Sequence, residues 1–452
     1  MPPPDSIPPT PRRRTPWIIG ALLLVLAGVG LFLLLTQPRP PGSASATGTR
    51  SPVTASPSAA LPSDAAADTA RPTATLDLAA EVEAIKDEVA PIRELEERTD
   101  VPARFLDADG LERELRELTD EESPPEEIAV DERLLKRLGL LPEDADLRAL
   151  VLELLGDAIA GFYNPDEERL VIVQRSGDFG ALERFTIAHE FTHALQDQHY
   201  DLDQIRPEGD AVTSDADLAR LAFVEGDAQL LSFLWAQENL GLSEMADLLT
   251  GSATAGQEDI LARMPPILRR QLLFPYFEGL TFVQGLYTAG GWEAVDAVYA
   301  DPPDSTEQIL HPERYPDDQP TTLDAADRAR ELGAGWTSVT SDTFGELYTQ
   351  VWLAQREPAD PDAEATAAAA AAGWGGDTVT MYEGDDDAWA IEWRTTWDGA
   401  DDAAEFRAAA DAVVAALPGE GDVIAGNDTE VTMLFASDAG TLADLRAAAA
   451  SN

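Results

Sequence analysis

Apolar residues follow different spacings in successive segments of the chain, and each spacing predicts a different kind of structure. Residues 17–36, WIIGALLLVLAGVGLFLLLT, contain no charged residue, and about 20 such residues suffice to span the hydrocarbon of a membrane. Between residues 37 and 75, proline, serine, threonine and alanine dominate and large apolar residues are few, which predicts a flexible linker. We therefore expect folded structure to begin near residue 76.

Helical spacing dominates the chain from residue 76 to 356. We expect an accessory helical segment over 76–150, with helices at 77–98, 107–119 and 125–139 and a short strand at 101–106. A strand pair at 158–163 and 169–174 then precedes helices at 179–200, 214–240, 266–288, 291–300 and 343–356. These elements predict a mainly helical domain over 151–356 with a small sheet at its edge. Residues 373–452 alternate strand and helix patterns and predict a small α+β C-terminal unit, so the expected fold class is α+β.

Positive charge beside the apolar run predicts its orientation. Arg12, Arg13 and Arg14 lie in the basic tail 1–16, whereas only Arg39 follows the run closely. By the positive-inside rule, the N-terminus is cytoplasmic and the rest of the chain lies outside. We expect a single-pass protein of the cell membrane, anchored through residues 17–36. The alternative is a cleaved signal peptide, although no clear small-residue cleavage site follows the run.

Composition excludes several classes of function. The 452 residues include no cysteine, so disulfides, thiolate zinc sites and cysteine nucleophiles are excluded. The formal net charge is -53, from 84 acidic and 31 basic residues. Such an excess of negative charge repels phosphate backbones, and we expect no nucleic acid partner.

The pentapeptide HEFTH, residues 189–193, carries the strongest chemical signal. His189 and His193 are four residues apart, so on a helix both imidazoles leave the same face and can reach one metal ion. Glu190 lies about 100° round the helix, where it can take a proton from a metal-activated water. Imidazole nitrogens suit zinc, which needs one or two further protein ligands to complete a tetrahedron with water. We predict one Zn²⁺ per chain, with Glu190 as the catalytic base.

Two residues compete for the role of third ligand. His199 has the spacing of the third histidine in the HExxHxxGxxH motif of metzincins, but Gln196 stands where that motif needs a glycine to break the helix. If the helix continues, His199 lies about 9 Å along the axis from His193. His199 is then a surface residue or an outer-shell partner of the site.

Glu225 is the better candidate for the third ligand. It lies in the segment LAFVEGDAQLLSFLW, 221–235, which is apolar almost all round and must be buried. A carboxylate there is costly unless it binds a metal or is paired, and a buried salt bridge to Arg220 or a neighbour is the alternative. Gly226 leaves room for a facing helix, and Asp227 is expected to orient a ligand histidine.

His189, Glu190, His193 and the pair Glu225-Gly226 resemble the zinc-binding elements of gluzincin-type metallopeptidases, the peptidase MA-like class. The wider phrases HEFTHALQDQHYDL, VEGDA and STEQILHPERY resemble a group of bacterial and haloarchaeal surface proteins. The wider resemblance spans about residues 76–450, and its peptidase-like part about 158–315. It implies a zincin-like domain with Glu225 as a ligand. Many gluzincins carry ExxxD on the glutamate helix, whereas position 229 here is Gln. The resemblance therefore does not support the role expected for Asp227, which follows only from its place two residues after Glu225.

Further residues are candidates for substrate contacts. In enzymes of this type, the strand before the HExxH helix pairs with extended substrate, which makes Leu170, Val171, Ile172 and Val173 candidates; a plain core strand is the alternative. A histidine or tyrosine often stabilises the oxyanion opposite the metal, and His311, with Tyr315 as its alternative, is our candidate. Tyr276 is a third possibility for the same role.

The expected function is hydrolysis of peptide bonds in peptides or proteins outside the membrane by metal-activated water. The main alternative is a catalytically silent zinc-binding surface protein that acts as a binding or structural module. A metal-free adhesion or scaffold module, in which HEFTH is a coincidence, is the second alternative.

Overall fold

The computed structural model describes residues 78–122, 124–158, 161–173, 179–207, 212–251, 261–355, 362–417 and 419–450. The expected basic tail, transmembrane helix and linker, residues 1–75, lie outside the described residues. Among the helices of the described ranges, none is long and apolar enough to cross a membrane.

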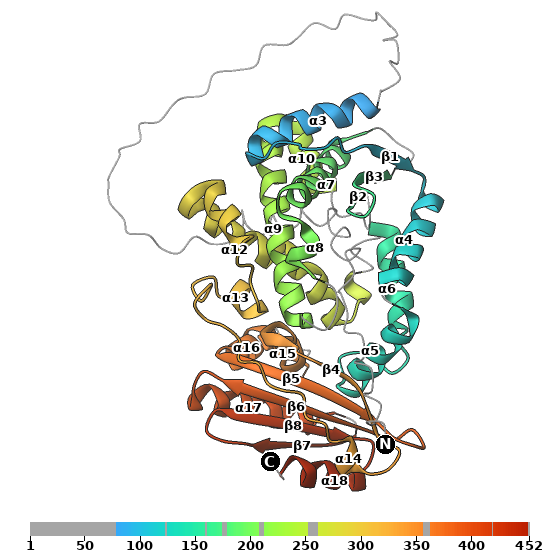
Figure 1. Cartoon of the computed structure of the whole chain (residues 1–452), viewed down its shortest axis with the longest axis vertical. Helices are drawn as coiled ribbons and strands as arrows, with labels where there is room; N and C mark the ends of the chain where they lie inside the picture. The colour runs from blue at the N-terminus through green and yellow to red at the C-terminus, as the bar shows by residue number, and fades with distance from the viewer. Residues whose placement is uncertain are drawn as a thin grey trace, which may run out of the picture.

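Two regions of different architecture make up the described chain, and together they confirm the α+β fold class (Figure 1). The first is mainly helical and comprises α3 Leu78–Arg93, β1 Ala103–Leu106, α4 Ala108–Glu122, α5 Pro125–Arg137, α6 Leu147–Ala158, β2 Gly161–Asn164, β3 Arg169–Val173, α7 Ala181–Tyr200, α8 Leu202–Ile205, α9 Ser214–Asn239, α10 Leu242–Gly251, α12 Pro266–Val298 and α13 Thr306–Leu310. The second comprises α14 Ala329–Leu332, β4 Thr337–Asp342, α15 Gly345–Ala354, α16 Ala363–Ala371, β5 Trp374–Glu383, β6 Trp389–Trp397, α17 Ala400–Val414, β7 Glu420–Ala425, β8 Glu430–Ala436 and α18 Ala439–Ala449.

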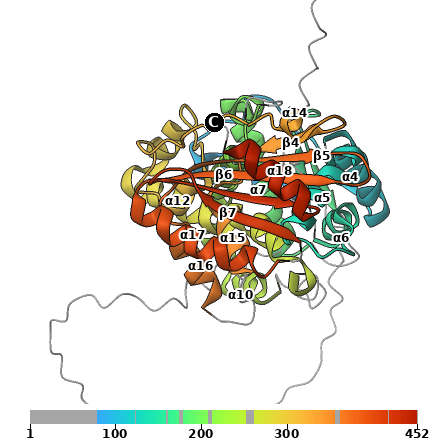
Figure 2. The same ribbon diagram turned by 90° about the horizontal axis from the view of Figure 1, so that it is seen from below.

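The second region is a five-stranded antiparallel sheet between two layers of helices. Its strand order is β4-β5-β6-β8-β7, so β4 and α15 extend the unit upstream of residue 373. Alternate residues face opposite sides: Val379 and Met381 pack with α15, α16 and α17, whereas Tyr382 packs with α14 and α18. Figure 2 shows α18 on the outer face of the sheet, away from the helical region.

The helix α7 lies at the centre of the first region. Its apolar residues pack with those of α9, α12 and α3, and α3 contributes Val82, Ile85 and Val89 to this common core. The helix α3 of the accessory segment is therefore joined to α7 by a shared core, whereas α5 places Ile128 and Leu134 in the core of the C-terminal region. A three-stranded sheet of order β1-β3-β2 packs against α7 on one face and α4 on the other.

The contact between α9 and α12 is close enough to require glycine on both helices. A Cβ on Gly226 would lie 2.3 Å from the carbonyl oxygen of Gly279, and a Cβ on Gly279 would lie 2.0 Å from that of Ala222. The two backbones therefore touch directly, as the expected role of Gly226 requires. This contact fixes how closely the side chains of α12 approach the HEFTH helix.

Candidate metal centre

Three side chains predicted as metal ligands converge in the core of the helical region. His189 and His193 lie on α7 and Glu225 on α9, and their ligand atoms all lie within 4.8 Å of one another. The Glu225 carboxylate oxygen Oε2 lies 3.0 Å from His189 Nε2 and 3.5 Å from His193 Nε2. All three residues are buried, with 0 %, 6 % and 2 % of their surfaces exposed.

The alternative partner for Glu225 is not used. The Arg220 guanidinium donates to Asp304 and to the carbonyl of Ile205 instead of to Glu225. A buried salt bridge between Arg220 and Glu225 is therefore excluded by the structure. Glu225 instead faces the imidazole nitrogens of His189 and His193.

Electrostatics within the cluster follow from burial and close charge. Burial raises the pKa of the Glu225 carboxyl, but the charge of His193 and the hydrogen bond with His189 outweigh it and lower the pKa to about 2. Burial lowers the pKa of His193, and the Glu225 carboxylate reverses this and raises it to about 9. The pKa of His189 stays below its ordinary value, chiefly because of burial. The protein thus holds an anionic ligand between two imidazoles and out of water.

Glu190 lies beside the three converging residues on α7. Its Oε2 accepts a hydrogen bond from the backbone N–H of Tyr163 on β2 at 2.8 Å. Its Oε1 is buried and has no hydrogen-bond partner among the described residues. Burial raises the pKa of this carboxyl to about 8. One oxygen is therefore held in place and the other is free to accept a proton.

Gln196 orients His193. Its Oε1 lies 2.8 Å from His193 Nδ1, and its amide nitrogen donates to the Val224 carbonyl and to Asp227. Asp227 therefore reaches the ligand histidine through Gln196 and not by a direct bond. The helix α7 continues through Gln196 to Tyr200. Gln196, which stands where metzincins have a glycine, therefore does not break the helix but bonds His193.

Tyr276, which the sequence offered only as a third oxyanion candidate, lies against the site. Its ring stacks on His189 with centroids 6.2 Å apart, and its buried hydroxyl lies near the Glu225 carboxylate. Burial and the nearby Glu225 and Glu190 charges raise its pKa well above the usual value, so the hydroxyl keeps its proton. It is a neutral hydrogen-bond donor in an apolar setting.

The remaining histidines and Tyr315 are not brought to this cluster. His199 stays on α7 and pairs through Nε2 with the Glu96 carbonyl, 2.8 Å away. His311 follows α13 and pairs with Glu346 on α15, while the Tyr315 hydroxyl donates to the Asp301 carbonyl. The expected outer-shell role of His199 and the oxyanion roles of His311 and Tyr315 therefore find no support in their contacts, because each side chain is committed elsewhere.

The expected pairing of Leu170–Val173 with substrate is wrong. These residues form β3, the central strand, which pairs with β1 in parallel and with β2 in antiparallel register. Both edges of β3 are used, so no further strand can add to it. The strand whose outer edge adjoins the cluster is β2, because the Tyr163 N–H reaches Glu190 instead of β3.

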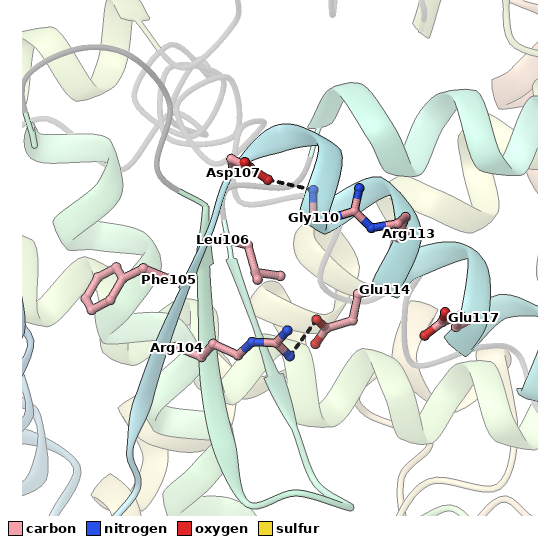
Figure 3. A pocket seen from close by; sticks show the side chains of 8 residues that line it. All are labelled: Arg104, Phe105, Leu106, Asp107, Gly110, Arg113, Glu114 and Glu117. Carbon is pink, nitrogen blue, oxygen red and sulfur yellow. Dashed lines mark hydrogen bonds and ion pairs between the residues drawn. The ribbon is translucent and has the colours of Figure 1, made fainter.

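A separate surface pocket lies between β1 and α4 (Figure 3). Within it, the Arg104 guanidinium donates to Glu114 at 2.8 Å. None of the converging metal-site residues lines it. The pocket is therefore distinct from the cluster.

The donor set at the cluster fits zinc. Two imidazole nitrogens and one carboxylate oxygen are the ligands of a catalytic zinc site that leaves a position open. A buried carboxylate gains from a nearby cation, because the low dielectric strengthens their attraction. His189, His193 and Glu225 would hold the ion, and Gln196 would orient His193.

Comparison with known proteins bears on the C-terminal region alone. A family model described as a domain of unknown function, DUF8575, matches residues 330–446. This range runs from α14 into α18 and includes the whole five-stranded sheet. No curated protein and no solved structure matches the chain.

Proposed function

We propose that this chain is a membrane-anchored, extracytoplasmic zinc metallopeptidase. The observation that carries the proposal is the convergence of His189, His193 and Glu225 beside a carboxylate, Glu190, that has one free oxygen. A purely structural metal site has no use for an additional buried carboxylate whose burial is costly. A bound zinc ion would supply the Lewis acidity that makes water nucleophilic at neutral pH.

Residues of the chain supply the other parts of the chemistry. Glu190 Oε1 accepts the proton of the attacking water and returns it to the leaving amine. The Tyr276 hydroxyl donates a hydrogen bond to the oxyanion that forms on the scissile carbonyl. An extended peptide lies along β2, whose Tyr163 is directly beside Glu190.

Membrane anchoring is the second part of the proposal. Its support is the uncharged run at 17–36 together with Arg12, Arg13 and Arg14 on its N-terminal side. Such an anchor places the folded region outside the cytoplasm after a linker of residues 37–75. In intact cells, added protease should remove the folded region, and alkaline carbonate should fail to extract the full chain. Release of full-length protein by carbonate contradicts the anchor.

Substitution of Glu190 by Gln tests the proposed reaction. We expect Glu190→Gln to bind one zinc ion per chain, as the wild type does, because Glu190 is not among the three ligands. Its peptide cleavage should fall by about 10²–10⁴-fold, since an amide cannot accept the proton. Metal content is measured by mass spectrometry, and turnover by fragment analysis on a peptide library. Glu238→Gln, which changes an exposed carboxylate on α9, is the control and should leave both values unchanged.

Retention of wild-type turnover by Glu190→Gln refutes the mechanism. The low exposure of the cluster favours one second candidate, a catalytically silent protein that holds zinc for structure or binding. That candidate predicts stoichiometric zinc in both proteins and no cleavage of any peptide by the wild type. Wild-type protein purified without chelators and free of zinc contradicts both candidates.

A further inference from the structure

A buried chain of hydrogen bonds connects the first helix of the folded region to His193. Arg93, the last residue of α3, donates through Nε and Nη2 to both oxygens of Asp227, at 2.9 and 3.0 Å. Asp227 accepts from the Gln196 amide nitrogen at 3.0 Å, and Gln196 Oε1 lies 2.8 Å from His193 Nδ1. Arg93, Asp227 and Gln196 are each fully buried. The chain therefore runs through three side chains that water does not reach.

The partners of Gln196 determine which way its amide faces. Its two neighbours on one side, the Val224 carbonyl and Asp227, are acceptors, so the NH₂ group must face them. The amide oxygen is then left to face His193 Nδ1, which must carry a proton to bond with it. His193 Nε2 is then the nitrogen that faces Glu225, 3.5 Å from its Oε2, and the one that a metal ion would use.

Arg93 holds the Asp227 carboxylate in the position from which it accepts from Gln196. A guanidinium has only donors, so both oxygens of Asp227 are fixed as acceptors toward Arg93 and Gln196. The guanidinium itself is held by a third bond, to Asp296 at 2.7 Å, and lies over the Trp292 ring at 4.3 Å from its centroid. The planar group therefore cannot turn without the loss of several contacts.

We propose that Arg93 is a positioning residue for His193, acting through Asp227 and Gln196. The inference rests on the proposed zinc site for its purpose and on the hydrogen-bond chain for its geometry. It gives α3 a role in the site although Arg93 lies 134 residues from Asp227 in sequence. The helix α3 then contributes to the metal centre through Arg93.

The test uses Arg93→Lys in the full chain with two readouts. Lysine keeps the charge but cannot bond both Asp227 oxygens in one plane. We expect zinc affinity, measured by chelator competition, to weaken by about 10- to 100-fold. We also expect the His193 Nδ1–H proton, seen by NMR of ¹⁵N-histidine protein with and without zinc, to change from slow to rapid exchange with water.

A matched control separates positioning from stability. Arg206 is also fully buried and also bonds both oxygens of an aspartate on α9, Asp217, at 2.8 Å, but that pair lies outside the chain to His193. Arg206→Lys should lower stability to a similar extent and leave zinc affinity and the Nδ1–H signal unchanged. Equal behaviour of the two variants in both readouts overturns the proposal.

The outcomes keep this inference apart from the proposed function. If the wild type binds no zinc, the proposed function fails, and the Nδ1–H signal of the metal-free protein still decides the role of Arg93. If Arg93→Lys does not fold, Asp227→Asn, which keeps the shape of the side chain, replaces it. An unchanged Nδ1–H signal and zinc affinity in Asp227→Asn overturn the inference.

Discussion

At the scale of single residues, Gln196 shows how one side chain changes the class of a site. In a metzincin-like arrangement, a glycine at this position lets the chain turn so that a third histidine reaches the metal. Here the helix continues, His199 pairs with the Glu96 carbonyl, and Gln196 bonds His193 Nδ1. The third position at the cluster is filled by Glu225 from another helix. Gln196 therefore keeps His199 away from the site and orients His193 within it.

Tyr276 carries the next prediction at this scale. Tyr276→Phe removes only the hydroxyl and keeps the ring against His189. If the hydroxyl binds the oxyanion, kcat should fall by about 10²- to 10³-fold with little change in KM or zinc content. Steady-state kinetics with a cleaved peptide measure this. A variant with unchanged kcat removes Tyr276 from the mechanism, and His311→Gln is the control that should keep wild-type kcat.

At the scale of elements, the crossing of α9 and α12 sets the shape of the site. Gly226 and Gly279 allow backbone contact, and Tyr276 lies one turn before Gly279 on α12. The ring of Tyr276 reaches His189 because the two helices approach so closely. A change in their separation should therefore alter both stability and the position of the hydroxyl.

Gly279→Ala tests the crossing, and Gly285→Ala is its control on the same helix. The new methyl at Gly279 would meet the Ala222 carbonyl, so we expect a loss of about 1–3 kcal/mol of unfolding free energy and reduced kcat. A methyl at Gly285 meets nothing within 4 Å, and alanine there should stabilise by about 0.5–1 kcal/mol. Urea denaturation measures both. Equal stability of the two variants contradicts the close contact.

The small sheet shows where patterns along the chain do not decide an arrangement. The patterns predicted a strand at 101–106 and a pair at 158–163 and 169–174, and the structure has strands at all three places. The patterns did not predict the strand order β1-β3-β2, because the sequence pattern of an apolar strand is the same at the centre of a sheet and at its edge. Only pairing with β1, 67 residues upstream in the register Ala103 to Leu170, makes β3 central.

At the scale of the whole molecule, the start of α9 joins the helical region to the C-terminal region. The Asp215 backbone N–H donates to the Thr343 carbonyl, and the Ser214 N–H donates to the Asp342 carboxylate. Asp215, at the start of α9, accepts hydrogen bonds from the backbone and hydroxyl of Thr306 and lies against Gly345 at the start of α15. Asp377 of β5 accepts from the backbone N–H groups of Phe344 and Gly345. Burial raises the pKa of Asp215 to about 8 and that of Asp377 to about 7.

This junction predicts a dependence of stability on pH. The folded-state pKa of Asp215 lies above its ordinary value of 3.8, so its stabilising contribution is complete below about pH 4 and is lost as pH rises to about 8. One such group lowers the unfolding free energy by up to about 1.4 kcal/mol per pH unit in this window. Asp215→Asn should reduce the slope. Denaturation at pH 5, 6, 7 and 8 measures it, and parallel profiles for the two proteins contradict the prediction.

The sequence by itself determined what depends on neighbours along the chain. The spacing of apolar residues predicted most helices and strands, and the separation of His189, Glu190 and His193 placed these three on one helix, because both follow from the local backbone repeat. The buried surroundings of Glu225 also singled it out, since an isolated carboxylate in an apolar helix needs a partner.

Tertiary packing alone decided which side chains from distant elements meet. Arg93 arrives from α3, Tyr276 from α12 and the edge strand β2 from before α7, and no spacing along the chain relates them to HEFTH. His311 looked equally suitable in sequence but pairs with Glu346 in the fold. Contacts of this kind depend on how closely helices approach and which faces they bury, and here two glycines at the α9–α12 crossing set that distance.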